Sequence, residues 1–234
     1  MSEKGYTTLK RDRYERKFMV TALHYEGIVQ TVKNHPAYFN PIYQERYINN
    51  IYLDTPTLSY YFHNQVGTSQ RQKVRIRWYG ELQGYIERPI LELKRKNGMT
   101  GTKRSYPLPG FSMDADLSHR SLHEIIQKAD LPEDVREILH GLKATLVNRY
   151  RRRYFLDFSG GYRVTLDREM SYHPVLEDRI RPSSMTLENG TVVELKYDAS
   201  LDDEAQGIST SFPFRMTKNS KYVKGIEMFY PIPL

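Results

Sequence analysis

The sequence predicts an α+β protein built mainly on an antiparallel sheet of about eight strands, closed or strongly curved, with helices around it. The main observation is that charged residues occupy every second position of several strand-like segments, with apolar residues between them. Side chains two apart on a strand share one face, so each segment carries a row of charge on one face and core-forming residues on the other. The rows are Lys73, Arg75 and Arg77; Arg88, Glu92, Lys94 and Lys96; Arg149, Arg151 and Arg153; and Glu194 and Lys196. Rows of mixed sign on several strands predict a charged interior that suits a polyanion held with metal ions.

The first quarter of the chain predicts strands and helices in alternation. Residues 13–20 alternate in polarity and predict the first strand. Residues 22–34 predict a helix that ends before a proline, and residues 48–53 predict the next strand. A turn around a proline then favours a short helix near residues 57–64.

The next segment predicts a β-hairpin. Residues 73–79 and 86–96 read as two strands, and the glycines at positions 80 and 84 favour a turn between them. A further turn favours a short return strand at residues 102–108.

The second half of the chain predicts a helical insertion followed by more strands. Apolar residues follow helical spacing within about residues 114–146, and Pro132 divides this insertion into two helices. Strands are predicted at residues 147–158 and 162–168, which form a second hairpin, and at residues 191–198. We expect residues 1–234 to form a single domain.

Composition narrows the function classes. The chain of 234 residues has a formal net charge of +7, which favours anionic partners such as nucleic acid, an anionic membrane surface or phosphate-rich small molecules. It has no cysteine, which excludes disulfides, cysteine-ligated zinc and thiol catalysis. No apolar run approaches the roughly 18 residues of a membrane span. We therefore expect a soluble, cytoplasmic protein.

Eight short motifs carry a resemblance to a known family. They occur in order along nearly the whole chain: RYERKF at 13–18, IYLDT at 51–55, KVRIRWYG at 73–80, LELKRK at 91–96, YRRRYF at 150–155, RVTLDREM at 163–170, VELKYD at 193–198 and KNSKY at 218–222. Together they resemble the VTC domain, the polyphosphate polymerase branch of the triphosphate tunnel metalloenzyme (CYTH-like) superfamily. The ordered set is what identifies the family, since each motif alone is common.

The resemblance implies an eight-stranded antiparallel β-barrel that forms a tunnel, with peripheral and inserted helices. It implies an ATP-dependent polyphosphate polymerase, which transfers the γ-phosphate of ATP to a growing chain that leaves through the tunnel. The residues at the matching catalytic positions are Arg75, Arg77, Lys94, Arg152 and Lys196. The residues at the matching phosphate-binding positions are Lys17, Lys103, Lys218, Ser220 and Lys221. Four arginines crowd the run at 149–153, so alternation alone leaves open whether Arg152 or its odd-numbered neighbours face inward.

The resemblance also implies that the protein uses a divalent metal ion. Glu194 matches the metal-binding glutamate, and Glu92 and Glu15 are candidate further ligands for Mn²⁺ or Mg²⁺. The first strand reads Arg13, Glu15, Lys17 on one face, whereas the hydrolytic branch opens with E-x-E-x-K. This departure favours the polymerase over the hydrolases.

Other interpretations of the same residues remain. A metal-dependent triphosphatase would use the same tunnel, and a non-catalytic module would bind polyphosphate or nucleic acid through a basic surface. Alternating Lys and Arg is also common on a solvated sheet face, and the seven histidines show no spacing typical of a metal site. The expected partners are ATP and polyphosphate, with a membrane protein as a further candidate and nucleic acid not expected.

Overall fold

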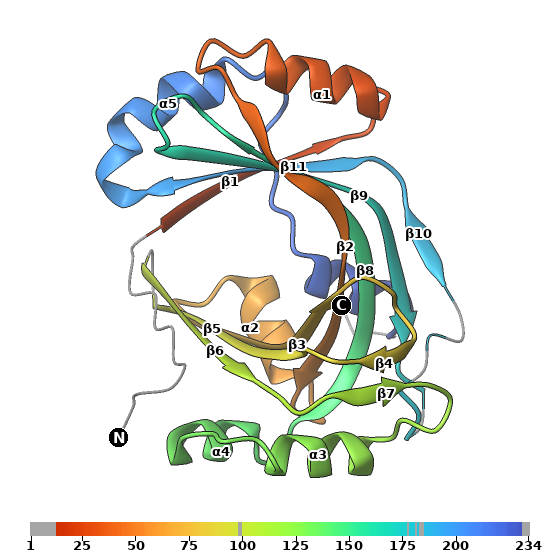
Figure 1. Cartoon of the computed structure of the whole chain (residues 1–234). Helices are drawn as coiled ribbons and strands as arrows, with labels where there is room; N and C mark the ends of the chain where they lie inside the picture. The colour runs from red at the N-terminus through yellow and green to blue at the C-terminus, as the bar shows by residue number, and fades with distance from the viewer. Residues whose placement is uncertain (1–12, 98–99, 177, 181, 183–184, 231–234) are drawn as a thin grey trace, which may run out of the picture.

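A computed structural model describes residues 13–97, 100–176, 178–180, 182 and 185–230 of the chain. Its main element is a nine-stranded antiparallel sheet (Figure 1). Eight strands lie on one hydrogen-bonded path, in the order β1 (Arg13–Val20), β11 (Thr191–Asp198), β9 (Tyr162–Pro174), β8 (Lys143–Leu156), β2 (Asn40–Asp54), β3 (Gln70–Tyr79), β5 (Ile90–Asn97) and β6 (Thr100–Pro107). The short strand β10 (Thr186–Glu188) pairs with β9. The predicted α+β class and its antiparallel sheet are confirmed.

The sheet is strongly curved but its hydrogen bonds do not close a barrel. Strands β1 and β6 lie at the two ends of the path, and no pairing between them is present in the described part of the chain. The long strands β2 and β8 run from the upper to the lower half of the molecule, so the two halves of the sheet face each other (Figure 1). The predicted barrel is therefore an open, curved sheet with a concave face.

Helices cover the sheet in three places, each with its own apolar core. Helices α1 (Tyr25–Lys33) and α5 (Asp202–Thr210) cover the outside of the upper half around Phe18 and Leu195. Helices α3 (His119–Gln127) and α4 (Glu133–Leu139) lie below the lower half, around Ile76 and Leu91. Helices α2 (Ser59–Val66) and α6 (Lys221–Phe229) contact each other, and α6 packs on β8 and β9. No helix among the described residues is both long and apolar enough to cross a bilayer.

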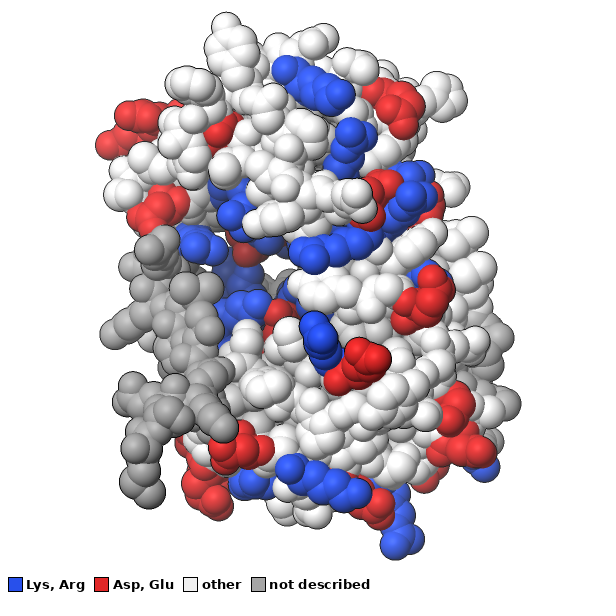
Figure 2. Space-filling view, in the orientation of Figure 1, with Lys and Arg blue, Asp and Glu red and all other residues white. Residues whose placement is uncertain are grey.

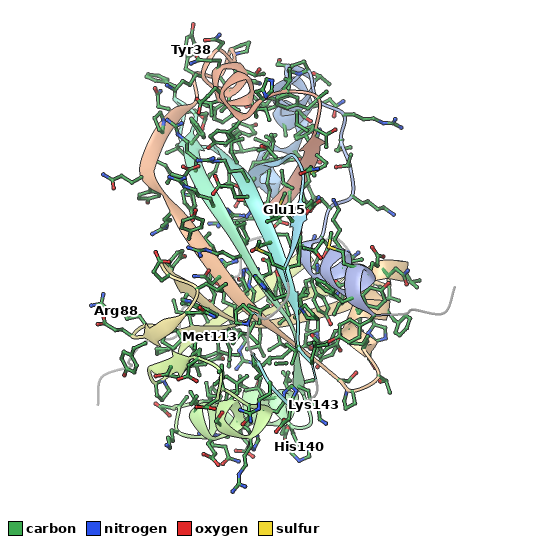
Figure 3. All side chains as sticks on the ribbon, turned by 90° about the vertical axis from the view of Figure 1, so that its right-hand side faces the viewer. Glu15, Tyr38, Arg88, Met113, His140 and Lys143 are labelled. Carbon is green, nitrogen blue, oxygen red and sulfur yellow. The ribbon has the colours of Figure 1, made fainter. Side chains whose placement is uncertain are left out.

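Several predicted elements need correction. The predicted strand at 86–96 is two strands, because Pro89 lacks an N–H group to continue a ladder. Its first part, β4 (Gly84–Ile86), pairs with β7 (Phe111–Met113) in a separate sheet, so β3 pairs with β5 without forming the simple hairpin expected. Arg88 consequently leaves the charged row and points outward at the edge of the molecule (Figure 3).

The helices α3 and α4 confirm the two expected helices, and Pro132 precedes α4 as its N-cap. Residues 143–146 were expected in the helical insertion but begin β8. The predictions contained no helix after residue 198, where the structure has the 3₁₀ turn η1 (Ala199–Leu201), α5 and α6. Strand β2 begins eight residues earlier than the predicted residue 48, at Asn40.

One buried carboxylate fixes α6 to the sheet. Asp54, at the end of β2, accepts hydrogen bonds from the backbone N–H groups of Tyr60 (2.9 Å) and Tyr61 (2.8 Å) in the first turn of α2. The N-cap residue of α2, Leu58, supplies no side-chain hydrogen bond, so Asp54 satisfies these donors in its place. The Tyr222 hydroxyl of α6 also donates to Asp54. One side chain therefore joins β2, α2 and α6.

Replacing this carboxylate should destabilise the protein. Asp54→Ala leaves buried N–H groups and the Tyr222 hydroxyl without their acceptor, so we expect a loss of about 3 kcal/mol in the free energy of unfolding. Tyr222→Phe removes one of these bonds and should cost about 1 kcal/mol. The measurement is urea denaturation, with the exposed Asp203→Ala as the matched control. A loss from Asp54→Ala no larger than that of the control would contradict this role.

Candidate functional site

The concave face of the sheet carries a cluster of charged side chains, which we call the charged cluster. Cross-strand pairs place its members on one face, because directly opposed residues of antiparallel strands project to the same side. Lys73 lies opposite Lys94, Arg75 opposite Glu92, and Glu15 opposite Lys196. The cluster consists of the basic residues Lys17, Lys73, Arg75, Arg77, Lys94, Lys103, Arg152, Lys196 and Lys221 and the acidic residues Glu15, Glu92, Asp167 and Glu194. Figure 2 shows a hollow between the two halves of the molecule with Lys and Arg side chains around it.

Glu92 holds the two arginines of β3 in place. Its Oε2 atom lies 2.7 Å from Arg75 Nε and 2.6 Å from Arg75 Nη2, and 3.5 Å from Arg77 Nη1. Lys103 of β6 pairs with its other oxygen. Burial alone would raise the pKa of Glu92, but Arg75, Arg77 and Lys103 lower it well below its usual range. Glu92 is therefore ionised and orients three cations.

Glu15 and Glu194 form a second group around Lys17. Lys17 Nζ lies 3.8 Å from Glu15 Oε2 and 3.4 Å from Glu194 Oε1, and Lys196 Nζ lies 2.9 Å from Glu194 Oε2. Burial and Glu194 would raise the pKa of Glu15, but Lys196, Lys94 and Lys17 lower it to about 2. The 2.5 Å ion pair from Lys94 Nζ to Glu15 Oε1 connects β5 with β1. It bridges the two halves of the sheet where backbone pairing is absent from the described strands.

Asp167 forms a third group, and the sequence predictions missed it. Arg152 forms a bidentate ion pair with it, with Nε 2.5 Å from Oδ1 and Nη2 2.7 Å from Oδ2. Lys221 of α6 lies 2.5 Å from Oδ2 of the same carboxylate. Asp167 belongs to the RVTLDREM motif, and its place opposite Arg152 in the β8–β9 ladder is the signal that could have identified it.

The arginines at 149–153 divide between the two faces of the sheet. Arg152 is buried and within 3.6 Å of Glu194. Arg149 and Arg151 project to the other face of β8, where Arg149 lies over the Tyr47 ring at 3.8 Å and Arg151 pairs with Glu45 at 2.9 Å. The row of odd-numbered arginines at 149–153 therefore faces outward. Arg152, the residue selected by the family resemblance, faces inward.

Lys73 is a further cluster residue that the motif comparison did not include among the phosphate-binding positions. Its Nζ donates a 2.8 Å hydrogen bond to Ser220 Oγ, and it forms no ion pair with any carboxylate of the described residues. Burial, followed by Lys17 and Lys94, lowers the pKa of Lys73 well below its usual value. The alternation of Lys73, Arg75 and Arg77 is the signal that could have identified it.

The predicted K-x-S-K element is only partly in the cluster. Ser220 caps α6 by accepting a hydrogen bond from the Val223 N–H (3.3 Å), and it contacts Lys73. Lys221 reaches Asp167 as described above. Lys218 is exposed and lies outside the charged cluster.

The three candidate metal ligands fall in two places. Glu15 and Glu194 converge on Lys17, whereas Glu92 lies with Arg75, Arg77 and Lys103. No group of three or more His, Asp or Glu side chains in the described ranges could hold a metal ion by itself. A Mg²⁺ or Mn²⁺ ion bound by one or two carboxylates completes its oxygen ligands with substrate phosphates. The paired carboxylates of Glu15 and Glu194 fit that arrangement.

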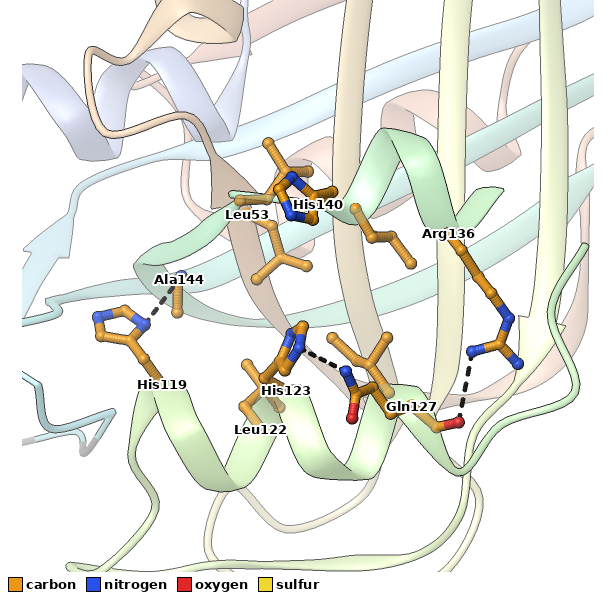
Figure 4. A pocket seen from close by; sticks show the side chains of 11 residues that line it. Leu53, His119, Leu122, His123, Gln127, Arg136, His140 and Ala144 are labelled. Carbon is orange, nitrogen blue, oxygen red and sulfur yellow. Dashed lines mark hydrogen bonds between the residues drawn. The ribbon is translucent and has the colours of Figure 1, made fainter. Parts of the chain in front are cut away.

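A cavity of about 320 Å³ lies apart from the charged cluster (Figure 4). Apolar side chains of α3, α4 and the sheet line it, together with His119, His123 and His140. The backbone N–H of Ala144 donates to His119 Nδ1 at 3.2 Å, and Arg136 donates to the backbone carbonyl of Gln127 at 3.4 Å. These polar groups support the packing of the helices, so we place the candidate site at the charged cluster.

The charged cluster predicts an acid-sensitive contribution to stability. Burial would raise the pKa of Asp167, but Arg152 and Lys221 lower it from 3.8 to about 2. Because the folded-state pKa lies below the unfolded value, this stabilisation is present above pH 4 and is lost as the pH falls towards 2, at about 2 kcal/mol. Asp167→Asn should be less stable at pH 7, because Arg152 and Lys221 lose their partner, and should lose less stability on acidification.

Urea denaturation between pH 7 and pH 2 measures both effects, with the exposed Asp203→Asn as control. An acid-induced loss as large in Asp167→Asn as in the parent protein would show that Asp167 is not the titrating group.

Comparisons with solved structures support the fold. The chain is similar to the PH1819 protein from Pyrococcus horikoshii OT3, with a TM-score of 0.52 and 14% sequence identity, over 92% of this chain and 99% of that one. It is also similar to a putative adenylate cyclase from Vibrio parahaemolyticus, with a TM-score of 0.50 and 14% identity, over 92% of this chain and 97% of that one. A search of curated proteins found no match.

A family model gives the more specific result. The model of the VTC domain matches residues 12–230, which include all the strands and helices described above. This extent agrees with the ordered motifs of the sequence and with the concave, basic sheet. The chain belongs to the VTC domain family.

Proposed function

We propose that this protein is an ATP-dependent polyphosphate polymerase, which transfers the γ-phosphate of ATP to a polyphosphate chain at the charged cluster. The observation that carries the proposal is that each of the four carboxylates in the cluster is paired with at least one cation. Their pKa values lie below the usual range, so at neutral pH they are ionised and weakly basic. Such a site is poorly equipped to activate water. A terminal phosphate is already a nucleophile and needs no general base.

The cations supply what phosphoryl transfer requires, which is positioned phosphate oxygens and neutralised charge. Arg75 and Arg77 offer planar guanidinium groups that bind two oxygens at once, and Glu92 holds them in position before a ligand arrives. Arg152 is oriented in the same way by Asp167. The nine basic side chains exceed the four acidic ones, so the concave face favours a polyanion.

A divalent metal ion would be held by Glu194 and Glu15 together with the substrate phosphates. When bound, Mn²⁺ or Mg²⁺ supplies charge neutralisation at the phosphate oxygens. Glu92 remains a candidate ligand from the other side of the cluster.

The arrangement of the charged cluster also bears on nucleic acid as a partner. We expect little nucleic-acid binding, because the charged cluster lies on a concave face and a nucleic-acid duplex needs an exposed basic surface. A membrane protein remains a candidate partner of the proposed enzyme.

Phosphorus NMR of the protein with ATP and Mn²⁺ tests the proposal directly. We expect the signal of chain-interior phosphate and ADP to rise together. Release of free phosphate alone would show that the protein is a triphosphatase, and ATP binding without turnover would show that it is a binding module.

The proposed metal ligand gives a separate prediction. Glu194→Gln should keep phosphate binding but lose metal-dependent turnover by at least about tenfold, since one carboxylate ligand is removed. Full activity of this variant would place the metal at another carboxylate.

The paired arginines of β3 provide a second prediction. Arg75→Gln with Arg77→Gln should weaken tripolyphosphate binding by at least about 100-fold, because two charge-assisted contacts are lost. Isothermal titration calorimetry measures the affinity, and circular dichroism checks the fold. The matched control is Arg149→Gln with Arg151→Gln, which makes the same charge change on the opposite face of the sheet. Equal losses in the two double variants would indicate a general charge effect and argue against the proposed site.

A further inference from the structure

A second, aromatic group of residues lies on the concave face at one end of the charged cluster. Arg46 of β2 lies over three tyrosine rings, with its Cζ 4.3 Å from the Tyr79 centroid, 5.1 Å from Tyr154 and 5.8 Å from Tyr43. Its Nη2 also lies 3.5 Å from the Tyr154 hydroxyl. Arg46 forms no ion pair with a carboxylate in the part of the chain that the structure describes, and its side chain is exposed. We call Arg46, Tyr43, Tyr79 and Tyr154 the aromatic platform.

The strand register places this platform directly beside the phosphate-binding rows. Arg46 lies opposite Arg152 in the β2–β8 ladder, and Tyr79 follows Arg77 by two positions on β3. Both therefore project to the concave face. Residues two apart on a strand are separated by about 7 Å, a distance that a ribose bridges. The β3 row thus changes from basic to aromatic at this end.

The other end of the same row is covered by α6. Lys73, at the opposite end of the row from Tyr79, donates to Ser220 at the start of α6. The aromatic platform is instead accessible, with Tyr79 45% and Tyr43 56% exposed. A ligand with phosphates at the charged cluster therefore has one exposed aromatic surface beside it.

We propose that the aromatic platform binds the base of a nucleoside triphosphate whose phosphates lie on Arg75, Arg77 and Arg152. This inference rests on the proposed function and extends it, because it makes the platform the part of the site that distinguishes a nucleotide from an inorganic triphosphate. A base stacks on tyrosine rings and on a planar guanidinium, whereas inorganic tripolyphosphate has no group for these surfaces. The un-neutralised Arg46 also favours the electron-rich face of a base.

The test compares a non-hydrolysable ATP analogue with inorganic tripolyphosphate by isothermal titration calorimetry in the presence of Mn²⁺. Tyr79→Ala and Arg46→Lys should weaken binding of the analogue by about 5- to 150-fold and leave tripolyphosphate binding within about twofold. Arg46→Lys keeps the charge and removes the planar surface. Tyr79→Phe should retain nucleotide affinity, and Tyr85→Ala removes an exposed tyrosine of β4 as the matched control.

Each other outcome overturns the inference. Equal losses for both ligands would show a general effect on the site, and unchanged affinity for the analogue would show that the base lies elsewhere. A single-stranded oligoadenylate is titrated in the same way. If the variants weakened only its binding, the platform would belong to a nucleic-acid site. A parent protein that binds tripolyphosphate but not the nucleotide would refute the platform alone, whereas one that binds neither would refute the proposed function as well.

Discussion

The mutual neutralisation of charges on the concave face is the constraint on which the rest of this structure depends. Four carboxylates with little exposure to water face one another across the curved sheet, and each must be paired because an isolated buried charge costs several kcal/mol. The pairs link strands that are distant along the sheet path. Glu15 joins β1 to β5 through Lys94, and Asp167 joins β9 to α6 through Lys221. The ion pairs of Glu15, Glu194 and Asp167 thus connect β1, β5, β8, β9, β11 and α6, while Glu92 separately orients the arginines of β3.

That network leaves an excess of positive charge, and this excess connects stability with function. Carboxylates fix Arg75, Arg77 and Arg152 before any ligand arrives, so little side-chain freedom is lost on binding. Among the described residues Lys73 has the Ser220 hydroxyl as its hydrogen-bond partner and forms no ion pair with a carboxylate. In the proposed function, a polyphosphate would supply further negative charge. The side chains that stabilise the fold would then be the ones that bind the ligand.

The sequence predicted the strands better than the faces they present. Alternation located β3, β5 and β11, because each keeps one residue parity along its charged row. The strand predicted at 162–168 stops just before the ladder of β9 with β8 takes an extra residue at Glu169 (φ 51°), beyond which the inward side chains change from odd-numbered Asp167 to even-numbered Met170. Such a bulge depends on both strands and has no local sequence signature. Helix α5 was missed because its apolar positions are few, and α6 because its nine residues include a glycine and its stability comes from packing on the sheet.

The pairing of β1 with β11 has a consequence for biosynthesis. The first described strand of the chain finds its partner about 180 residues later, and Lys221 and Ser220 are contributed later still. In a chain still emerging from the ribosome, Glu92 follows Arg75 and Arg77 closely, whereas Lys17 of β1 and Arg152 of β8 meet Glu194 only once β11 has been made. Contacts of such long sequence separation form slowly. Glu194 from β11 and Lys221 from α6 therefore complete the charge pairing of the concave face only after nearly the whole chain has been made.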